Sequence, residues 1–231
     1  MYHRLGEVRR DSIVPGHYVA PTLFERQLRL LRALGMESIS LATMRAGLQG
    51  EATLPKRPVV LTFDDGYESF WELGMPRLRT YGTTATVFLV SNLIGGKNEW
   101  DLAKGDVEER LMSREQILQA ASEGIEFGAH TRRHADLAQI GLAEAEREIA
   151  GSKEDLEAWI DRSVDFFCYP YGAQTPEVRA LVARTGYLGA TGTRLHGNGP
   201  DSDPYLWGRI NVRYDHTPFR LLRRLLKAWK R

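Results

Sequence analysis

The stretch VVLTFDDGY, residues 59–67, runs from apolar and β-branched residues directly into two adjacent carboxylates, Asp64 and Asp65. Such a run is typical of a buried strand, so the pair stands where the strand ends. Gly66 then lets the backbone turn sharply. Because side chains alternate faces along a strand, one carboxylate can bind a metal ion while the other acts as a general base. A solvated Asp-Asp-Gly turn is the competing interpretation.

A second apolar run ends in GAHTRRH, residues 128–134. His130 and His134 are four positions apart, the spacing that places two imidazoles on one face of a helical turn. A His-x-x-x-His pair is a weak signal by itself. Together with the aspartates at another strand end, it provides the oxygen and nitrogen ligands of a divalent metal beside a carboxylate base. The residues therefore indicate metal-assisted hydrolysis.

Composition narrows the functional classes. The 231 residues are 42% hydrophobic, which is enough for a substantial core. A net charge of +1 implies no bulk attraction to nucleic acid, and the single cysteine, Cys168, excludes an intrachain disulfide. No apolar run reaches the length of a membrane span, and the start MYHRLGEVRRD has no apolar signal segment. As written, the chain is expected in the cytoplasm, with the periplasm or cell envelope as the alternative.

Strand-like and helical patterns alternate along the chain. The strand-like runs are expected at residues 59–63, 85–90, 125–130, 164–169, 188–193 and 208–212. This alternation favours an α/β fold with a parallel sheet, and the number of units fits a barrel formed by one domain over residues 1–231. The candidate metal ligands follow such runs, at the ends where α/β barrels build their active sites.

Capping residues mark the expected helix starts. Ser113 with Gln116 and Thr22 with Glu25 have the spacing of capping boxes. Thr175 precedes a proline at the first helical position, which is a further start signal. These helices lie between the strand-like runs, as the alternation requires.

Three motifs carry a resemblance to a known family. TFDDGY (62–67), HTRRH (130–134) and YPYG (169–172), in this order, resemble the polysaccharide deacetylase family, also called carbohydrate esterase family four or the NodB-homology domain. The likeness continues in MYHR, ATVFLV and WGRINV and so covers nearly the whole chain; it is closest to the exopolysaccharide-type deacetylases with an N-terminal Tyr-His. It implies a distorted (β/α)7 barrel and hydrolytic removal of acetyl groups from glycans.

The resemblance also implies roles for single residues. Asp65, His130 and His134 would hold one divalent metal, most often zinc, and Asp64 would be the base that deprotonates the attacking water. The backbone N–H of Tyr171 would stabilise the oxyanion. Judged from its spacing alone, a strand-end turn with aromatic packing is the less favoured interpretation of YPYG.

The chain departs from the family pattern at one position. Many members carry an arginine two residues before the proline of the third motif, where it orients the base carboxylate, and this chain has Cys168 there. A cation from elsewhere is expected to take its place, and Arg209 in WGRINV is the candidate. A buried arginine needs a carboxylate partner. An ordinary arginine at the barrel bottom or surface is the alternative.

The acid that protonates the leaving amine has two candidates. His196 lies in TRLHG, whose order does not match the Leu-x-His motif common in the family. His3 matches the N-terminal Tyr-His of the exopolysaccharide type, and imidazole suits proton transfer near neutral pH. His3 is therefore the predicted acid. His17 and His216 have no motif around them and are expected to be solvated.

Two further features bear on partners. Tyr67 and Trp100, in or near loops at the expected active-site end, are candidates for stacking on sugar rings. Trp100 belongs to an irregular insertion, residues 91–112, that is expected to form one wall of the cleft. The C-terminal FRLLRRLLKAWKR is a basic amphipathic pattern that fits a membrane-surface helix or, the favoured reading, a terminal helix packed on a barrel.

The leading functional hypothesis is a metal-dependent deacetylase acting on glycans that contain N-acetylglucosamine. Hydrolysis of a small cyclic amide or imide is the alternative enzyme class, since relatives of this fold act on such substrates. A glycan-binding domain without catalysis is the alternative from a different class. Release of acetate separates the first hypothesis from the other two.

Overall fold

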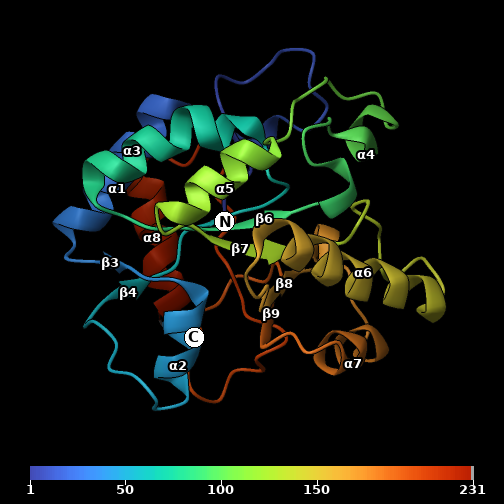
Figure 1. The fold of residues 1–231 in the computed structure, drawn as a ribbon. Helices are drawn as coiled ribbons and strands as arrows, with labels where there is room; N and C mark the ends of the chain where they lie inside the picture. Colours follow the sequence, from blue (N-terminus) through green and yellow to red (C-terminus); the bar gives the residue numbers. More distant parts are fainter. Residues whose placement is uncertain (230–231) are drawn as a thin grey trace.

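The computed structural model describes residues 1–229, and its centre is a curled sheet of five parallel strands (Figure 1). Each strand pairs with the next one along the chain. All the carboxyl ends therefore lie at one edge of the sheet. The strands are β5 (Thr62–Phe63), β6 (Thr86–Leu89), β7 (Glu126–Ala129), β8 (Phe166–Cys168) and β9 (Gly189–Thr191).

Helices connect the strands and lie around the outside of the curled sheet (Figure 1). Strands β5 and β6 are joined through α3, β6 and β7 through α4 and α5, β7 and β8 through α6, and β8 and β9 through α7. The helices are α1 (Pro21–Ala33), α2 (Leu41–Leu48), α3 (Met75–Tyr81), α4 (Glu99–Leu102), α5 (Arg114–Ser122), α6 (Leu142–Ile160), α7 (Pro176–Arg184) and α8 (Pro218–Trp229).

Two of the three expected helix starts are confirmed. Ser113 and Gln116 form the capping box of α5, and the Thr175 hydroxyl accepts from the backbone at the start of α7. The third expectation was wrong. Helix α1 starts at Pro21, because the fixed φ of proline suits the first helical position, and Thr22 therefore lies inside the first turn rather than at its cap.

Extended segments outside the main sheet differ from the expected strands. The run 59–63 is divided: β4 (Pro58–Val59) pairs with β3 (Glu37–Ser38), and only β5 joins the main sheet. β1 (Arg4–Leu5) pairs with β2 (Tyr18–Val19). Within the described residues, 208–212 is no strand, although Trp207 beside it makes one parallel bridge to Thr191. The structure thus shows a five-stranded α/β sheet, and the full (β/α)7 barrel stays a prediction.

One large hydrophobic cluster extends from Tyr2 to Leu221 through the middle of the molecule. Among residues 1–229, no helix combines the length and apolar character needed to cross a bilayer. The predicted basic C-terminal helix is present as α8, which packs on α1. Its last two basic residues, Lys230 and Arg231, lie outside the described residues.

Candidate metal centre and active site

The motif residues meet at the carboxyl edge of the sheet. Asp64 and Asp65 follow β5, His130 follows β7, and Tyr171 comes shortly after β8. In a parallel sheet these strand ends are neighbours, so motifs about sixty and forty residues apart in the chain come together. The parallel sheet therefore brings together residues that the sequence could place only at separate strand ends.

The predicted metal ligands converge on one point. The Oδ1 atom of Asp65 lies 3.3 Å from Nε2 of His130 and 3.3 Å from Nε2 of His134. All three side chains are buried, and their ligand atoms lie within 4.8 Å of one another. Among the described residues, this Oδ1 has no partner with hydrogen-bond geometry. A buried, orphaned carboxylate oxygen facing two imidazole nitrogens is what a bound cation would satisfy.

The outer partners of the two histidines leave their Nε2 atoms available. Nδ1 of His130 lies 2.7 Å from the carbonyl oxygen of Cys168. A carbonyl can only accept, so Nδ1 carries the proton and Nε2 of the neutral ring carries the lone pair. Nδ1 of His134 lies 3.0 Å from the Tyr171 hydroxyl. Metal-bound histidines generally have such partners, and the donor set of one carboxylate and two imidazoles fits zinc.

Backbone strain is concentrated at this site. Among the described residues, five that are not glycine have positive φ, and four of them lie in the three motifs: Asp65 (75°), Thr131 (64°), His134 (62°) and Tyr171 (60°). Such conformations cost energy and gather at functional sites. The expected helical turn between the two histidines was wrong, because left-handed residues make it an irregular turn that still brings both rings to Asp65.

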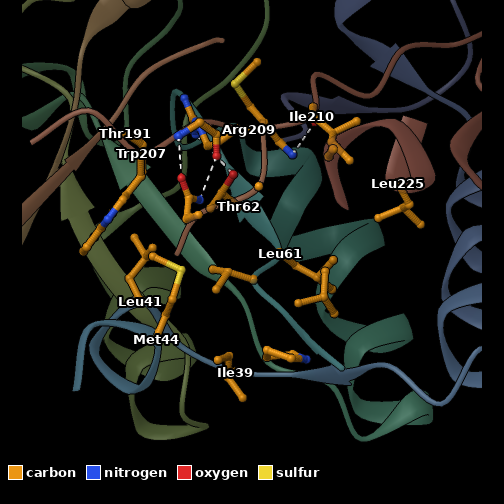
Figure 2. A pocket seen from close by; sticks show the side chains of 18 of the residues that line it. Ile39, Leu41, Met44, Leu61, Thr62, Thr191, Trp207, Arg209, Ile210 and Leu225 are labelled. Carbon is orange, nitrogen blue, oxygen red and sulfur yellow. Dashed lines mark hydrogen bonds between the residues drawn. The ribbon is translucent and has the colours of Figure 1, made fainter. Parts of the chain in front are cut away.

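The second carboxylate, Asp64, is held by Arg209. The two guanidinium Nη atoms donate to its two oxygens at 2.6 and 2.8 Å, and both side chains are buried. Arg209 also donates to the Thr62 hydroxyl (Figure 2) and to the carbonyl of Gly192. The sulfur of Cys168 lies 3.1 Å from Arg209, so the small side chain there leaves room for this arginine. Arg209 therefore pairs with Asp64, as expected from the presence of Cys168 where many family members have an arginine.

The pair lies in surroundings that favour an ionised base. Burial raises the pKa of Asp64, but the charge and hydrogen bonds of Arg209, together with the neighbouring His3 and His130, lower this pKa below its usual value. A largely apolar pocket of about 290 Å³ lies behind Arg209, with Leu41, Met44 and Leu61 in its wall (Figure 2). Apolar surroundings strengthen the ion pair. Asp64 is therefore a carboxylate at neutral pH and able to accept a proton.

The two candidate acids lie in different places. Nε2 of His3 is 4.0 Å from Oδ2 of Asp64, whereas His196 lines the apolar pocket behind Arg209. Burial, followed by the neighbouring His17, lowers the pKa of His3 to about 3, so its ring is neutral at pH 7. His3 is thus the histidine beside the base.

The expectation that His17 and His216 are solvated was wrong. The ring of His17 stacks on that of His3, with centroids 4.1 Å apart. His216 is only 6% exposed, and its Nδ1 accepts from the backbone of Arg213. The stacking of His17 on His3 joins two separate segments, and His216 lies in no motif, so no local sequence signal pointed to either contact.

A buried arginine, which the motifs did not single out, anchors the insertion 91–112. Arg4 donates to Asp101 at 2.6 Å, to Asp106 at 2.7 Å and to the Tyr67 hydroxyl at 2.9 Å. This network fixes α4, from which Trp100 stacks on the His134 ring at 4.5 Å. Tyr67 is 2% exposed, and its hydroxyl is turned to Arg4. The sequence did offer one signal for this network: an arginine lies next to His3, and the insertion contains two aspartates that could pair with it.

Loss of Arg209 should change the pH dependence of any reaction that uses Asp64 as a base. Arg209→Gln removes the charge that opposes burial, so the pKa of Asp64 rises and the low-pH limb of the kcat/KM profile moves to higher pH. Breaking a buried pair should also cost about 3–5 kcal/mol of unfolding free energy. A pH–rate profile and denaturant unfolding measure both. Arg220→Gln, which breaks an exposed pair with Asp215, is the control, and an unmoved limb would contradict this role for Arg209.

Comparisons with known proteins agree with this geometry. A family model described as polysaccharide deacetylase matches residues 51–190. YxkH of Bacillus subtilis (strain 168), a polysaccharide deacetylase by name, is 25% identical over 82% of this chain and 63% of its own length. The poly-beta-1,6-N-acetyl-D-glucosamine N-deacetylase of Staphylococcus aureus (strain N315) is 22% identical over 94% of this chain and 73% of its own length.

Solved structures show the same fold. The deacetylase PplD of Streptococcus pyogenes, in complex with acetate, matches with a TM-score of 0.84 at 24% identity, over 96% of this chain and 95% of that one. IcaB from Ammonifex degensii matches with a TM-score of 0.79 at 22% identity, over 95% of this chain and 92% of that one. The chain belongs to the polysaccharide deacetylase family, as its three motifs predicted.

Proposed function

We propose that this chain is a metal-dependent hydrolase that removes acetyl groups from N-acetylglucosamine-containing glycans. The observation that carries the proposal is the buried set of Asp65, His130 and His134 beside the Asp64–Arg209 pair. The relative that acts, by name, on poly-beta-1,6-N-acetyl-D-glucosamine suggests that polymer as the first substrate to test. No observation on this chain favours a cyclic amide or imide.

The residues divide the chemistry between them. A divalent metal held by Asp65, His130 and His134 would supply a Lewis acid for the acetyl carbonyl and lower the pKa of the attacking water. Asp64 accepts the proton of that water, and Arg209 keeps Asp64 ionised and fixed in direction. The base Asp64 and the ligand Asp65 are adjacent residues, so the relative positions of these two carboxylates are set by the strained turn at Asp65.

The leaving amine needs a proton, and His3 is placed to give it. Because burial keeps the pKa of His3 low, its ring is neutral before reaction and must first gain a proton. The proton taken up by Asp64 would pass from Oδ2 to Nε2 of His3 once their present separation of 4.0 Å shortens to hydrogen-bond distance in the substrate complex, and then to the amine nitrogen. The backbone N–H of Tyr171 would donate to the oxyanion, and the left-handed φ at this residue helps to set its direction.

The proposal also includes closure of the sheet into a barrel and a sugar contact at the wall formed by residues 91–112. The backbone of Tyr2 donates to Thr62 and that of Val212 to Met1, contacts that would continue the sheet towards a closed (β/α)7 barrel. Trp100, which is 8% exposed and lies on His134, is the proposed sugar contact of the wall.

The activity is tested by release of acetate. Metal-loaded protein is incubated with oligomers of β-1,6-linked N-acetylglucosamine, and acetate and free amine are measured together. Equal amounts of both, abolished by a chelator and restored by zinc, are expected. Turnover of a cyclic imide without acetate release would move the chain to the alternative enzyme class, and glycan binding without turnover would make it a binding domain.

The acid role of His3 is tested by changing the leaving group. His3→Gln is expected to lower kcat on the N-acetyl substrate by about 10²-fold or more, because the amine then leaves without a proton donor. It should leave hydrolysis of p-nitrophenyl acetate nearly unchanged, since nitrophenolate needs no proton to depart. His196→Ala is the matched control. Equal losses on both substrates, or a loss carried by His196→Ala instead, would remove His3 from this role.

A further inference from the structure

A second histidine lies directly against the predicted acid. His17 ends a short 3₁₀ turn, Pro15–His17, and immediately precedes β2. Strands β1 and β2 pair in parallel with Arg4 opposite Tyr18, which makes His3 and His17 neighbours across the two segments. Their rings are stacked, with centroids 4.1 Å apart and planes inclined by only 7°. This contact joins two backbone segments whose relative position the strand pairing fixes.

The ring of His3 lacks the usual device that orients a catalytic imidazole. Such rings are generally held by a hydrogen bond from Nδ1 to a carboxylate or carbonyl. Nδ1 of His3 is buried and has no hydrogen-bond partner among the described residues. The stacked face of His17 is therefore a contact that can fix the ring where a hydrogen bond does not.

A shared metal ion does not explain the pair. Ligand atoms of His3, His17 and Asp65 lie within 4.8 Å of one another, so the three are close enough to suggest a second metal site. An imidazole binds a metal along a lone pair in the plane of its ring, about 2.0–2.1 Å from the nitrogen. Two nearly parallel stacked planes cannot both contain the same ion. The geometry favours stacking over ligation.

From these contacts we infer that His17 is a positioning residue: its ring stacks on His3 and holds Nε2 of that ring towards Asp64. The inference rests on the proposed function, because it gives His3 the role of acid. Nε2 of His3 is already 4.0 Å from Oδ2 of Asp64, so a rotation of the ring away from Asp64 would keep the two atoms from closing to the distance that proton transfer needs. This role requires a flat ring at position 17, and it does not require the ring to contain nitrogen atoms.

Three variants separate stacking from the other possible roles. His17→Ala should lower kcat on the N-acetyl substrate about tenfold with little change in KM, while hydrolysis of p-nitrophenyl acetate and metal content stay as in the wild type. His17→Phe should restore most of kcat, because phenylalanine stacks but cannot bind a metal or donate a hydrogen bond. His17→Gln should not restore it. His196→Ala is the control, because His196 lines the apolar pocket behind Arg209 and does not stack on His3.

The outcomes that would overturn the inference are distinct. Rescue by His17→Gln but not His17→Phe would make His17 a hydrogen-bonding group, and a loss of bound zinc in His17→Ala would make it a ligand. If the wild type releases no acetate, the proposed function fails, but the positioning role is still measured by crystal structures of the variants. The His3 ring should be displaced in His17→Ala and in its wild-type position in His17→Phe. A His3 ring that is not displaced in His17→Ala would refute the positioning role of His17.

Discussion

Replacing Asp64 by asparagine is expected to lower kcat for acetate release by about 10²–10⁴-fold while one metal ion stays bound. The carboxylate is the group that accepts the proton of the attacking water, and general-base catalysis contributes on this scale. An asparagine side chain has nearly the same shape and can still accept from Arg209, so the neighbouring turn should persist. Because Asp64 is not among the converging ligands, metal affinity should change little.

The measurement is kcat on an N-acetylglucosamine oligomer together with metal content and thermal unfolding of the same preparation. Asp201→Asn, an exposed aspartate, serves as the matched control and should behave as the wild type. A variant at position 64 that retains metal and folds but keeps wild-type kcat would show that Asp64 is not the base. A variant that loses metal as well would make Asp64 a ligand.

Replacing His134 by alanine should abolish acetate release by removing the metal. Its Nε2 is one of two imidazole nitrogens facing Asp65, so its loss leaves only Asp65 and His130 in that ligand group. Zinc affinity should fall by more than the roughly 10–100-fold that loss of an outer partner costs. Calorimetric zinc titration of the chelated protein measures this.

Tyr171→Phe provides the matched comparison. It removes the hydroxyl that contacts Nδ1 of His134 and leaves the ligand itself in place. Its zinc affinity is expected to fall by about 10–100-fold and its kcat to fall less than that of His134→Ala. Wild-type zinc affinity in His134→Ala, or a greater loss in Tyr171→Phe, would contradict the proposed ligand set.

The sequence predicted the metal ligands and the base of the site better than the residues that hold other site residues in position. Asp65, His130 and His134 could be placed together because each follows a strand of one parallel sheet. Arg209 could be predicted as the partner of Asp64, because Cys168 stands where many family members have the arginine that orients this carboxylate. The contacts of Arg4 were not predicted and His17 was wrongly expected to be solvated, because their contacts join segments of the chain whose packing no local pattern specifies.

Local signals failed where a stronger constraint was present. Thr22 has capping-box spacing, but Pro21 beside it fixes the start of α1 two residues earlier than a cap at Thr22 would, with Ala20 at the cap. The His-x-x-x-His spacing suggested a helical turn, and the backbone instead uses left-handed residues at Thr131 and His134. The run expected as a strand at 208–212 is no strand, and the bridge to Thr191 is made by Trp207 just before it, since β pairing depends on neighbours that the pattern does not reveal.

Anomalous scattering at the zinc edge from crystals of the metal-loaded protein tests the central claim most directly. The account predicts one peak, about 2.0–2.2 Å from a carboxylate oxygen of Asp65 and from Nε2 of His130 and of His134. Other groups also lie close enough to hold an ion: Asp64 with His130 and Cys168, or His3 with His17 and Asp65. A peak at either of these instead, or none at the predicted position, would contradict it.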